Sequence, residues 1–273
     1  MLAQQRHAMI LDLLEQNGTV YTSDLVKRMN VSSETIRKDL DYLEQKERLV
    51  RVHGGAVPTA ANQSANTKML SDVPAEYTAF QIRNTQHMAE KAAITDYAAS
   101  MIKEHQVIAL DYGSTSQMMA MTLRKKFRFL TIITNSIQNA LILAECPDFT
   151  IILTGGVLSK QEYTLVNDFT PILDHLHIDV LFLTASGIDP EVGITDMLLN
   201  EVKVQNQMRK AASQVIVLAD SSKFGRSSLV KVCTLQDVDA ILTDRNLSPD
   251  LEQKIRSTGS NLVLVPDLPT AES

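Results

Sequence analysis

The feature that most constrains the fold is a repeated order of apolar strand, polar turn and helix over the C-terminal two thirds of the chain. Apolar runs without alternation belong to strands covered on both faces, and a helix between successive strands is the connection that parallel strands require. The sequence therefore predicts an α/β domain built on a parallel sheet. The predicted strands are residues 107–110, 130–133, 149–153, 180–185, 215–219, 240–243 and 262–265, and predicted helices cover about 85–102, 118–123, 137–144 and 201–212.

Polar turns follow the carboxyl ends of these strands, the edge at which open α/β sheets bind ligands. The candidate binding residues are Asp111, Gly113, Ser114, Thr115, Thr134, Asn135, Ser136, Gly155, Gly156, Asp220 and Lys223. Gly113-Ser114-Thr115 between a strand and a helix is typical of a phosphate cradle. Lys223 supplies a cation, and Asp111 or Asp220 could accept sugar hydroxyls. One such turn is more often an ordinary helix cap, but four on one edge favour a site.

Composition excludes several classes of protein. The 273 residues are 44% hydrophobic and 21% charged, an ordinary globular profile with room for one small and one larger domain. Apolar runs stay far below the ~20 residues of a membrane span, and the N-terminus is too polar for a signal peptide. Two cysteines form no disulfide framework, and His175 and His177 have no spaced third ligand. We expect a cytoplasmic protein without a membrane segment, metal or cofactor.

A second signal lies near the N-terminus. Ser32 is a suitable N-cap, and Glu34 would sit in the first turn, where the helix dipole favours negative charge. Ile36, Leu40 and Leu43 then form one apolar stripe. Short hydroxyls and cations occupy the rest of the amino-terminal end, which is the end that a recognition helix inserts into the major groove. An amphipathic surface helix is the alternative interpretation.

The flanking segments favour DNA binding. A helix at residues 3–16, a short helix capped by Thr22 or Ser23, and a strand at 49–52 followed by His53-Gly54-Gly55 predict a winged helix-turn-helix over residues 1–57. Its candidate DNA contacts are Ser32, Ser33, Thr35, Arg37, Lys38, Arg51 and His53. Residues 1–57 hold eight basic and eight acidic side chains, so the net charge of −6 belongs to the remainder, which would face away from the phosphates.

Between the two predicted domains the composition changes to small polar residues. Residues 58–74 are predicted to be a linker, residues 75–266 a sensor domain and residues 267–273 a tail. Residues 78–83 could extend the tether.

The motifs carry a resemblance to a known family. The run Val31-Ser32, Thr35-Ile36-Arg37-Lys38-Asp39-Leu40 and Arg51-Val52-His53-Gly54-Gly55-Ala56 resembles the DeoR family of bacterial transcription regulators. Asp111-x-Gly113-Ser114-Thr115, Thr134-Asn135-Ser136, Gly155-Gly156, Ser186-Gly187-Ile188-Asp189, Gly193 and Asp220-Ser221-Ser222-Lys223-Phe224-Gly225 resemble its C-terminal sensor domain, which is similar in fold to ribose-5-phosphate isomerase. The resemblance implies a phosphorylated sugar or sugar derivative as effector. Many members have arginine where this chain has Lys38 and lysine where it has Gln205.

These observations predict a repressor of a carbohydrate-utilisation operon that binds double-stranded operator DNA as a homodimer or homotetramer and is released by a phosphorylated sugar. We do not expect an enzyme. The alternatives are a sugar-phosphate isomerase-like enzyme with a DNA-binding appendage, and a winged helix that binds protein. Glu201 and Asp196 could be acid–base groups of such an enzyme, although surface carboxylates are the commoner interpretation.

Overall fold

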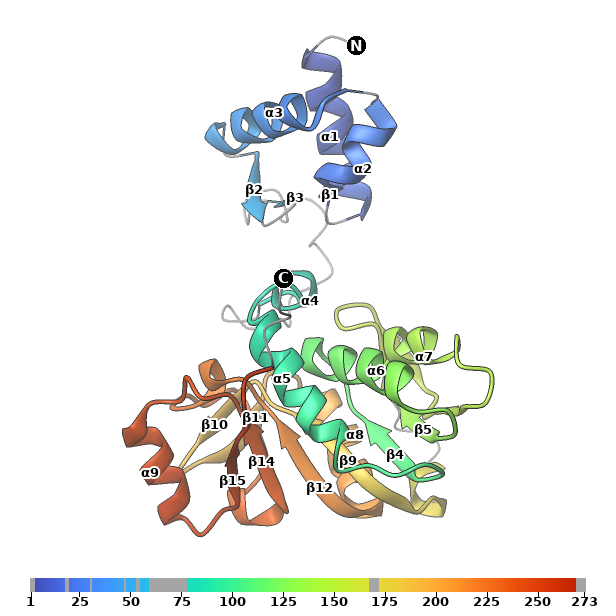
Figure 1. Ribbon diagram of the computed structural model, residues 1–273, viewed down its shortest axis with the longest axis vertical. Coiled ribbons are helices and arrows are strands. Elements are labelled where there is room, and N and C mark those ends of the chain that lie inside the picture. Colours follow the sequence, from blue (N-terminus) through green and yellow to red (C-terminus); the bar gives the residue numbers. More distant parts are fainter. Residues whose placement is uncertain are drawn as a thin grey trace. The chain divides into compact units, whose positions relative to one another are not determined.

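The computed structural model describes residues 3–17, 20–29, 31–46, 48–52, 55–58, 78–166 and 172–268. The chain divides into two compact units, Met1–Tyr77 and Thr78–Ser273, which Figure 1 draws together. The predicted DNA contact His53, the neighbouring Gly54, residues 59–74 of the predicted linker and residues 269–273 of the predicted tail lie outside the described residues.

The N-terminal unit is a small helical domain closed by a three-stranded sheet. Its elements are α1 (Ala3–Asn17), β1 (Val20–Tyr21), α2 (Thr22–Met29), α3 (Ser33–Gln45), β2 (Leu49–Val52) and β3 (Gly55–Pro58). The antiparallel sheet has the order β1-β3-β2. Ile10, Leu25, Ile36, Leu40 and Leu49 are almost fully buried between the helices and the sheet. The predicted winged helix-turn-helix fold is confirmed.

The C-terminal unit is organised around one parallel sheet of seven strands. They are β4 (Val107–Leu110), β5 (Thr131–Thr134), β6 (Thr150–Leu153), β9 (Ile178–Thr184), β12 (Ala212–Leu218), β14 (Ala240–Thr243) and β15 (Leu262–Leu264). Their order in space is β15-β14-β12-β9-β4-β5-β6, and every pair is parallel. After β4 the next strands, β5 and β6, are added on one side of it, whereas β9 and the strands that follow are added on the other side. The β4–β9 junction is therefore the topological switch point of the sheet.

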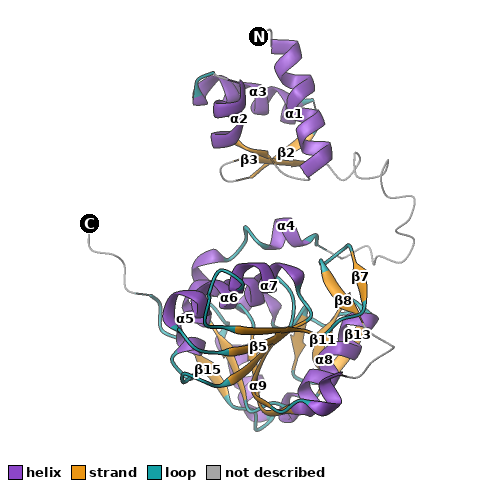
Figure 2. Cartoon of the chain, turned by 90° about the vertical axis from the view of Figure 1, so that its right-hand side faces the viewer, coloured by secondary structure: helices purple, strands orange, loops and turns teal. Residues whose placement is uncertain are grey.

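Helices cover both faces of this sheet, as the uninterrupted apolar strands predict. The helices α5 (Met88–Ala99), α6 (Ser114–Lys126) and α7 (Ile137–Leu143) pack on one face, and α8 (Leu199–Ala211) and α9 (Pro249–Ser257) pack on the other. Side chains alternate between the two cores: Ile108 and Leu110 of β4 face α5 and α6, whereas Ala109 faces the α8 side. Figure 2 shows the strands between the two helical layers. The predicted parallel α/β fold is confirmed.

Several smaller elements have no counterpart in the sequence prediction. An antiparallel sheet joins β10 (Gly187–Asp189), β11 (Gly193–Asp196) and β13 (Val230–Cys233), and β7 (Val157–Ser159) pairs with β8 (Thr164–Val166) as a hairpin. The described residues also form the short 3₁₀ helices η2 (Ile172–His175), η3 (Ser221–Lys223) and η4 (Leu235–Asp237). Their strands and turns are only three or four residues long, which is too short for a periodic pattern to be detected.

The interpretation of residues 78–83 as part of the tether is wrong. Residues Phe80–Arg83 form the helix α4, and Phe80 is buried in the C-terminal unit. A four-residue helix shows little more than one turn of periodicity, so its composition resembled that of the preceding polar segment.

Candidate effector pocket and DNA-binding helix

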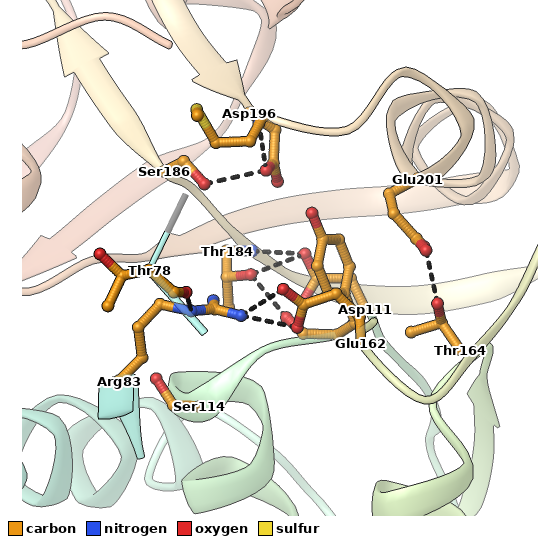
Figure 3. Close-up of polar contacts among 12 residues, drawn as sticks. Thr78, Arg83, Asp111, Ser114, Glu162, Thr164, Thr184, Ser186, Asp196 and Glu201 are labelled. Carbon is orange, nitrogen blue, oxygen red and sulfur yellow. Dashed lines mark hydrogen bonds and ion pairs between the residues drawn. The ribbon is translucent and has the colours of Figure 1, made fainter. Parts of the chain in front are cut away.

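A pocket opens at the switch point between β4 and β9. It measures about 340 Å³ including its open mouth, and Figure 3 shows the polar groups around it. Its lining comes from the turn after β4, the turn after β9, α4, β11 and η3: Arg83, Tyr112, Gly113, Ser114, Thr115, Thr184, Ala185, Ser186, Asp196 and Lys223. Four of the eleven residues predicted to bind an effector, Gly113, Ser114, Thr115 and Lys223, thus line one pocket although Lys223 is far from the others in sequence.

The turn after β4 has the conformation of an anion-binding loop. Gly113 has a φ of 104°, a conformation that L side chains rarely adopt, and α6 starts at the next residue. The first turn of a helix leaves N–H groups without partners inside the helix, so this end attracts negative charge. Ser114 and Thr115 add two hydroxyl groups within that first turn. The turn can therefore cradle a phosphate group.

Three cations surround this turn. Lys223 and Arg83 line the pocket, and Lys91 lies behind Ser114. The ammonium of Lys91 donates to the carbonyl oxygens of Arg83 at 2.6 Å and Gln86 at 2.7 Å, and to Oγ of Ser114 at 3.0 Å. Burial lowers the pKa of Lys91 to about 8, and repulsion from Lys223 and Arg83 adds to this shift. An anion in the pocket would relieve that repulsion.

Arg83 is a pocket residue that the sequence did not indicate. Its Nη2 donates to both carboxylate oxygens of Glu162, with 2.6 Å to Oε2, and its Nε donates to the carbonyl oxygen of Thr78 at 2.9 Å. Glu162 lies in the turn between β7 and β8 and is only 2% exposed. The pair therefore joins α4 to the β7–β8 hairpin beside the pocket (Figure 3).

Asp111 lies beneath the pocket rather than on its surface. Its Oδ2 accepts hydrogen bonds from the backbone N–H of Thr184 at 2.8 Å, from the Thr184 hydroxyl at 3.0 Å and from Gln205 at 3.1 Å. Burial raises the pKa of Asp111 to about 8, and the nearby carboxylate of Asp196 raises it further. Asp111 therefore organises the junction of β4 with β9, and its contact with an effector stays a prediction.

Gln205 links two carboxyl groups. Its Nε2 lies 3.1 Å from Oδ2 of Asp111 and 3.0 Å from Oδ2 of Asp196, whose Oδ1 accepts a hydrogen bond from Ser186 at 2.9 Å. Gln205 is almost fully buried and is absent from the pocket lining. The glutamine at this position, where many family members have lysine, therefore contacts the two carboxyl groups at the floor of the pocket. The interpretation of Asp196 as a surface carboxylate is wrong, because it is 3% exposed and lines the pocket.

The turn after β5 makes structural contacts. Ser136 caps α7 by accepting the N–H of Asn139, and Thr134 accepts the N–H of Ser136. Asn135 donates to Oε2 of Glu201 at 3.0 Å. Glu201 is 1% exposed, so its interpretation as a surface carboxylate is also wrong, and burial raises its pKa to about 7.

The remaining predicted effector residues also lie outside the pocket lining. Gly155 and Gly156 connect β6 to β7, both with positive φ. Asp220 caps η3, and its negative charge opposes the lowering of the pKa values of Lys91 and Lys223 that burial causes. Effector contacts of these residues, and of the turn after β5, remain predictions.

In the N-terminal unit, α3 starts as the sequence predicts. The Ser32 hydroxyl accepts the N–H of Thr35 at 3.2 Å, and Ser33 and Arg37 are exposed near that end. Lys38 is exposed and pairs with Glu34 at 3.0 Å.

Two sets of hydrogen bonds tie neighbouring elements to α3. The side chain of Arg51 on β2 bonds to Asp41 at 2.5 Å and to the carbonyl oxygen of Arg37 at 3.2 Å. On the other side, Asp39 is buried and accepts hydrogen bonds from Arg6 at 2.6 Å and His7 at 2.9 Å. Together they fix α3 against β2 and α1 and leave Arg37 to solvent.

Comparisons with known proteins agree with both domains. Residues 6–61 match the DeoR-like helix-turn-helix domain, and residues 86–245 match the DeoR C terminal sensor domain. The HTH-type transcriptional regulator GolR of Listeria innocua is 30% identical over 93% of this chain and 96% of its own length. The glycerol-3-phosphate regulon repressor of Escherichia coli is 31% identical, with coverages of 88% and 90%. The L-fucose operon activator of Haemophilus influenzae is 31% identical, with coverages of 91% and 94%.

Similarities to solved structures are more remote. A D-ribose-5-phosphate isomerase in complex with phospho-erythronic acid has a TM-score of 0.37 and 21% identity, covering 49% of this chain and 52% of its own. At these values the likeness does not bear on function. Among the described residues, no helix combines the length and apolarity needed to cross a membrane. Because both family domains match in order and relatives align over nearly their full length, the chain belongs to the DeoR family of DNA-binding transcription regulators.

Proposed function

We propose that this regulator represses a carbohydrate-utilisation operon and leaves its operator when a phosphorylated sugar or sugar derivative binds the C-terminal unit. The observation that carries the proposal is the pocket at the switch point. It combines a glycine turn, two hydroxyls and a helix N-terminus with Lys223 and Arg83. A phosphate monoester fits the chemistry of this end, because cations and N–H groups favour negative charge.

The other end of the pocket suits the sugar. Asp196 and Ser186 present carboxylate and hydroxyl groups there (Figure 3). Such groups accept and donate hydrogen bonds to hydroxyls, and a few well-placed polar groups usually fix the orientation of a small ligand. The proposed effector thus has its phosphate at the turn after β4 and its hydroxyls toward β9 and β11.

On the DNA side, we propose that Ser32, Ser33, Thr35, Arg37 and Lys38 contact the operator through the amino-terminal end of α3, with Arg51 and His53 in or near the wing. Exposed Arg37 suits base contact, and Lys38 suits phosphate contact. One winged helix reads few base pairs, so a homodimer or homotetramer that places paired units on two half-sites is expected.

Relatives support the proposal that this regulator represses its operon. Besides the glycerol-3-phosphate regulon repressor, a putative aga operon transcriptional repressor of Escherichia coli is 30% identical over 96% of this chain and 93% of its own length. An anion that lowers operator affinity must bind the DNA-free state more tightly, by a coupling free energy of typically about 1–3 kcal/mol.

An isomerase-like enzyme is the second candidate. The pKa values of Glu201 at about 7 and Asp111 at about 8 lie in the range that suits general acid–base catalysis. Neither carboxyl group is in the pocket lining, however, and both are engaged with neighbouring side chains. We therefore propose that the chain is not an enzyme. Conversion of aldose phosphates to ketose phosphates by the full chain would reverse this choice.

Two substitutions test the effector site. Phosphorylated sugars are first screened for a rise in the thermal unfolding midpoint, since a ligand selective for the folded state stabilises it. Ser114→Asp should place a carboxylate at the phosphate position, and Lys223→Ala should remove an attracting cation. Both variants should hold operator DNA yet fail to release it at effector concentrations that release the parent. Arg128→Ala is the control, because Arg128 is an exposed cation outside the pocket lining. A parental response in both variants would place the site elsewhere.

A further inference from the structure

Arg83 makes contacts that connect the pocket with the point where the chain enters the C-terminal unit. Its side chain lines the pocket, its Nη2 holds Glu162 and its Nε holds the carbonyl oxygen of Thr78. Thr78 is the first described residue after residues 59–77, the stretch that leads from the DNA-binding unit. A single guanidinium group therefore touches both the proposed effector site and the end of the inter-unit segment.

We propose that Arg83 is an effector-binding residue and transmits binding to the DNA-binding unit by exchanging the carboxylate of Glu162 for the phosphate of the effector, which loosens its hold on Thr78. This inference rests on the proposed function, because it requires an anionic effector at the turn after β4.

The charges favour such an exchange. Arg83, Lys91 and Lys223 repel one another around the turn, and Glu162 supplies one negative charge against Arg83. A phosphate monoester carries up to about two negative charges at neutral pH and offers three acceptor oxygens. Nη1 of Arg83 lies near the turn, 3.6 Å from where a Cβ on Gly113 would stand. The planar fork of arginine matches carboxylate and phosphate equally well, so a phosphate at the turn competes with Glu162 for the guanidinium.

The geometry limits what Arg83 can hold at once. Figure 3 shows the guanidinium between Thr78 and Glu162, with Ser114 near the side chain of Arg83. The backbone carbonyl of Arg83 is fixed by the ammonium of Lys91, which also holds Ser114 at 3.0 Å. Because the backbone is anchored, a turn of the guanidinium toward a phosphate must be made by the side chain. Nε and Nη2 belong to one rigid plane, so that turn disturbs both contacts.

Two substitutions separate binding from transmission. Arg83→Lys keeps the positive charge but removes the fork, and Glu162→Gln removes the competing charge with little change of shape. Each variant and the parent are titrated with an operator fragment, by fluorescence anisotropy, with and without glycerol 3-phosphate, glucose 6-phosphate and fructose 1-phosphate. Circular dichroism melting verifies that each variant is folded, and Arg128→Ala serves again as the matched control.

For the parent and Arg128→Ala, the active sugar phosphate should lower operator affinity by roughly 5–150-fold. In Arg83→Lys the ratio of operator affinity without the sugar phosphate to operator affinity with it should fall toward one. Glu162→Gln should bind the operator several-fold more weakly than the parent without any sugar phosphate, because Arg83 has lost the partner that holds it in the DNA-competent position.

The Glu162→Gln measurement requires no effector, so an operator affinity equal to the parent's in this variant would contradict the proposed exchange of carboxylate for phosphate. A parental loss of operator affinity on adding the sugar phosphate to Arg83→Lys would contradict it as well. If no phosphorylated sugar changes the operator affinity of the parent, the proposed function itself fails and the inference fails with it. If a sugar phosphate changes the operator affinity of the parent but the two variants do not behave as predicted, only the inference about Arg83 fails.

Discussion

Replacing Asp111 by Asn should remove a large pH dependence from the stability of the C-terminal unit. In the unfolded chain this carboxyl ionises near its ordinary pKa of 3.8, whereas burial raises the pKa in the folded protein to about 8. Between these values the folded state binds the extra proton, so the contribution of Asp111 to stability is highest at low pH and falls as pH rises toward 8.

The expected magnitude follows from the two pKa values. Each titrating carboxyl in this window lowers the free energy of unfolding by about 1.4 kcal/mol per pH unit, so the parent should lose about 3–4 kcal/mol through Asp111 between about pH 5 and about pH 8. Asparagine can accept the same hydrogen bonds from Thr184 and Gln205 through its amide oxygen. Its NH₂ group would replace Oδ1, which has no hydrogen-bond partner among the described residues. Any penalty for that donor is the same at every pH.

The measurement is urea unfolding followed by circular dichroism at several pH values, since the chain has no tryptophan for fluorescence. The quantity of interest is the unfolding free energy of Asp111→Asn minus that of the parent, because titrating groups that do not interact with Asp111 cancel in this difference. It should increase by about 3–4 kcal/mol from about pH 5 to about pH 8. A difference that stays constant over this range would show that Asp111 does not hold its proton in the folded state.

The remaining predictions concern the DNA-binding unit. Arg37→Ala should cost about 1–3 kcal/mol of binding free energy at the preferred operator and relax the sequence preference. Lys38→Ala should weaken binding uniformly across sequences and lower the slope of log affinity against log salt concentration by roughly one. Footprints at several salt concentrations identical to the parent's would contradict both predictions. Gly55→Ala would place a Cβ 2.0 Å from the carbonyl oxygen of Val20, so the urea midpoint of this unit should fall by an amount equivalent to about 1–3 kcal/mol. Ser32→Asp should keep the helix cap, and hence thermal stability, yet weaken operator binding by repelling phosphate; unchanged affinity would remove Ser32 from the interface.

The sequence predicted the architecture because its rules are local or repeat many times. Continuous apolar strands imply burial on two faces, and the carboxyl ends of parallel strands must share one edge. That reasoning brought Lys223 to the same pocket as Gly113, Ser114 and Thr115, about 110 residues away in the chain. It could not distinguish the turns after β4 and β12, which supply pocket residues, from those after β5 and β6, since strand order depends on long-range packing.

The missed residues share a different cause. Arg83 ends the four-residue helix α4, Glu162 lies in the turn between β7 and β8, and Asp196 ends a strand of the small antiparallel sheet. A lone charged residue in such a segment has no pattern to mark it as buried, so the prior for a solvated side chain prevails. Only the tertiary pairing of Arg83 with Glu162, and the bridge from Gln205 to Asp196, reveal that these charges face inward.

The distribution of charge within the pocket favours a ligand with two chemically different ends. Arg83 lies with Ser114 at the helix N-terminus on one side, and Asp196 lies with Ser186 on the other (Figure 3). Lys223 also lines the pocket, within reach of the charge of Asp196. Inorganic phosphate would satisfy the first set and leave the second facing water, whereas a neutral sugar would leave the crowded cations unrelieved. A sugar phosphate engages both, so its affinity should exceed that of either part, and each part alone is a poor competitor. The same asymmetry gives the phosphate a second task in the proposed mechanism, because only an anion can draw Arg83 away from Glu162.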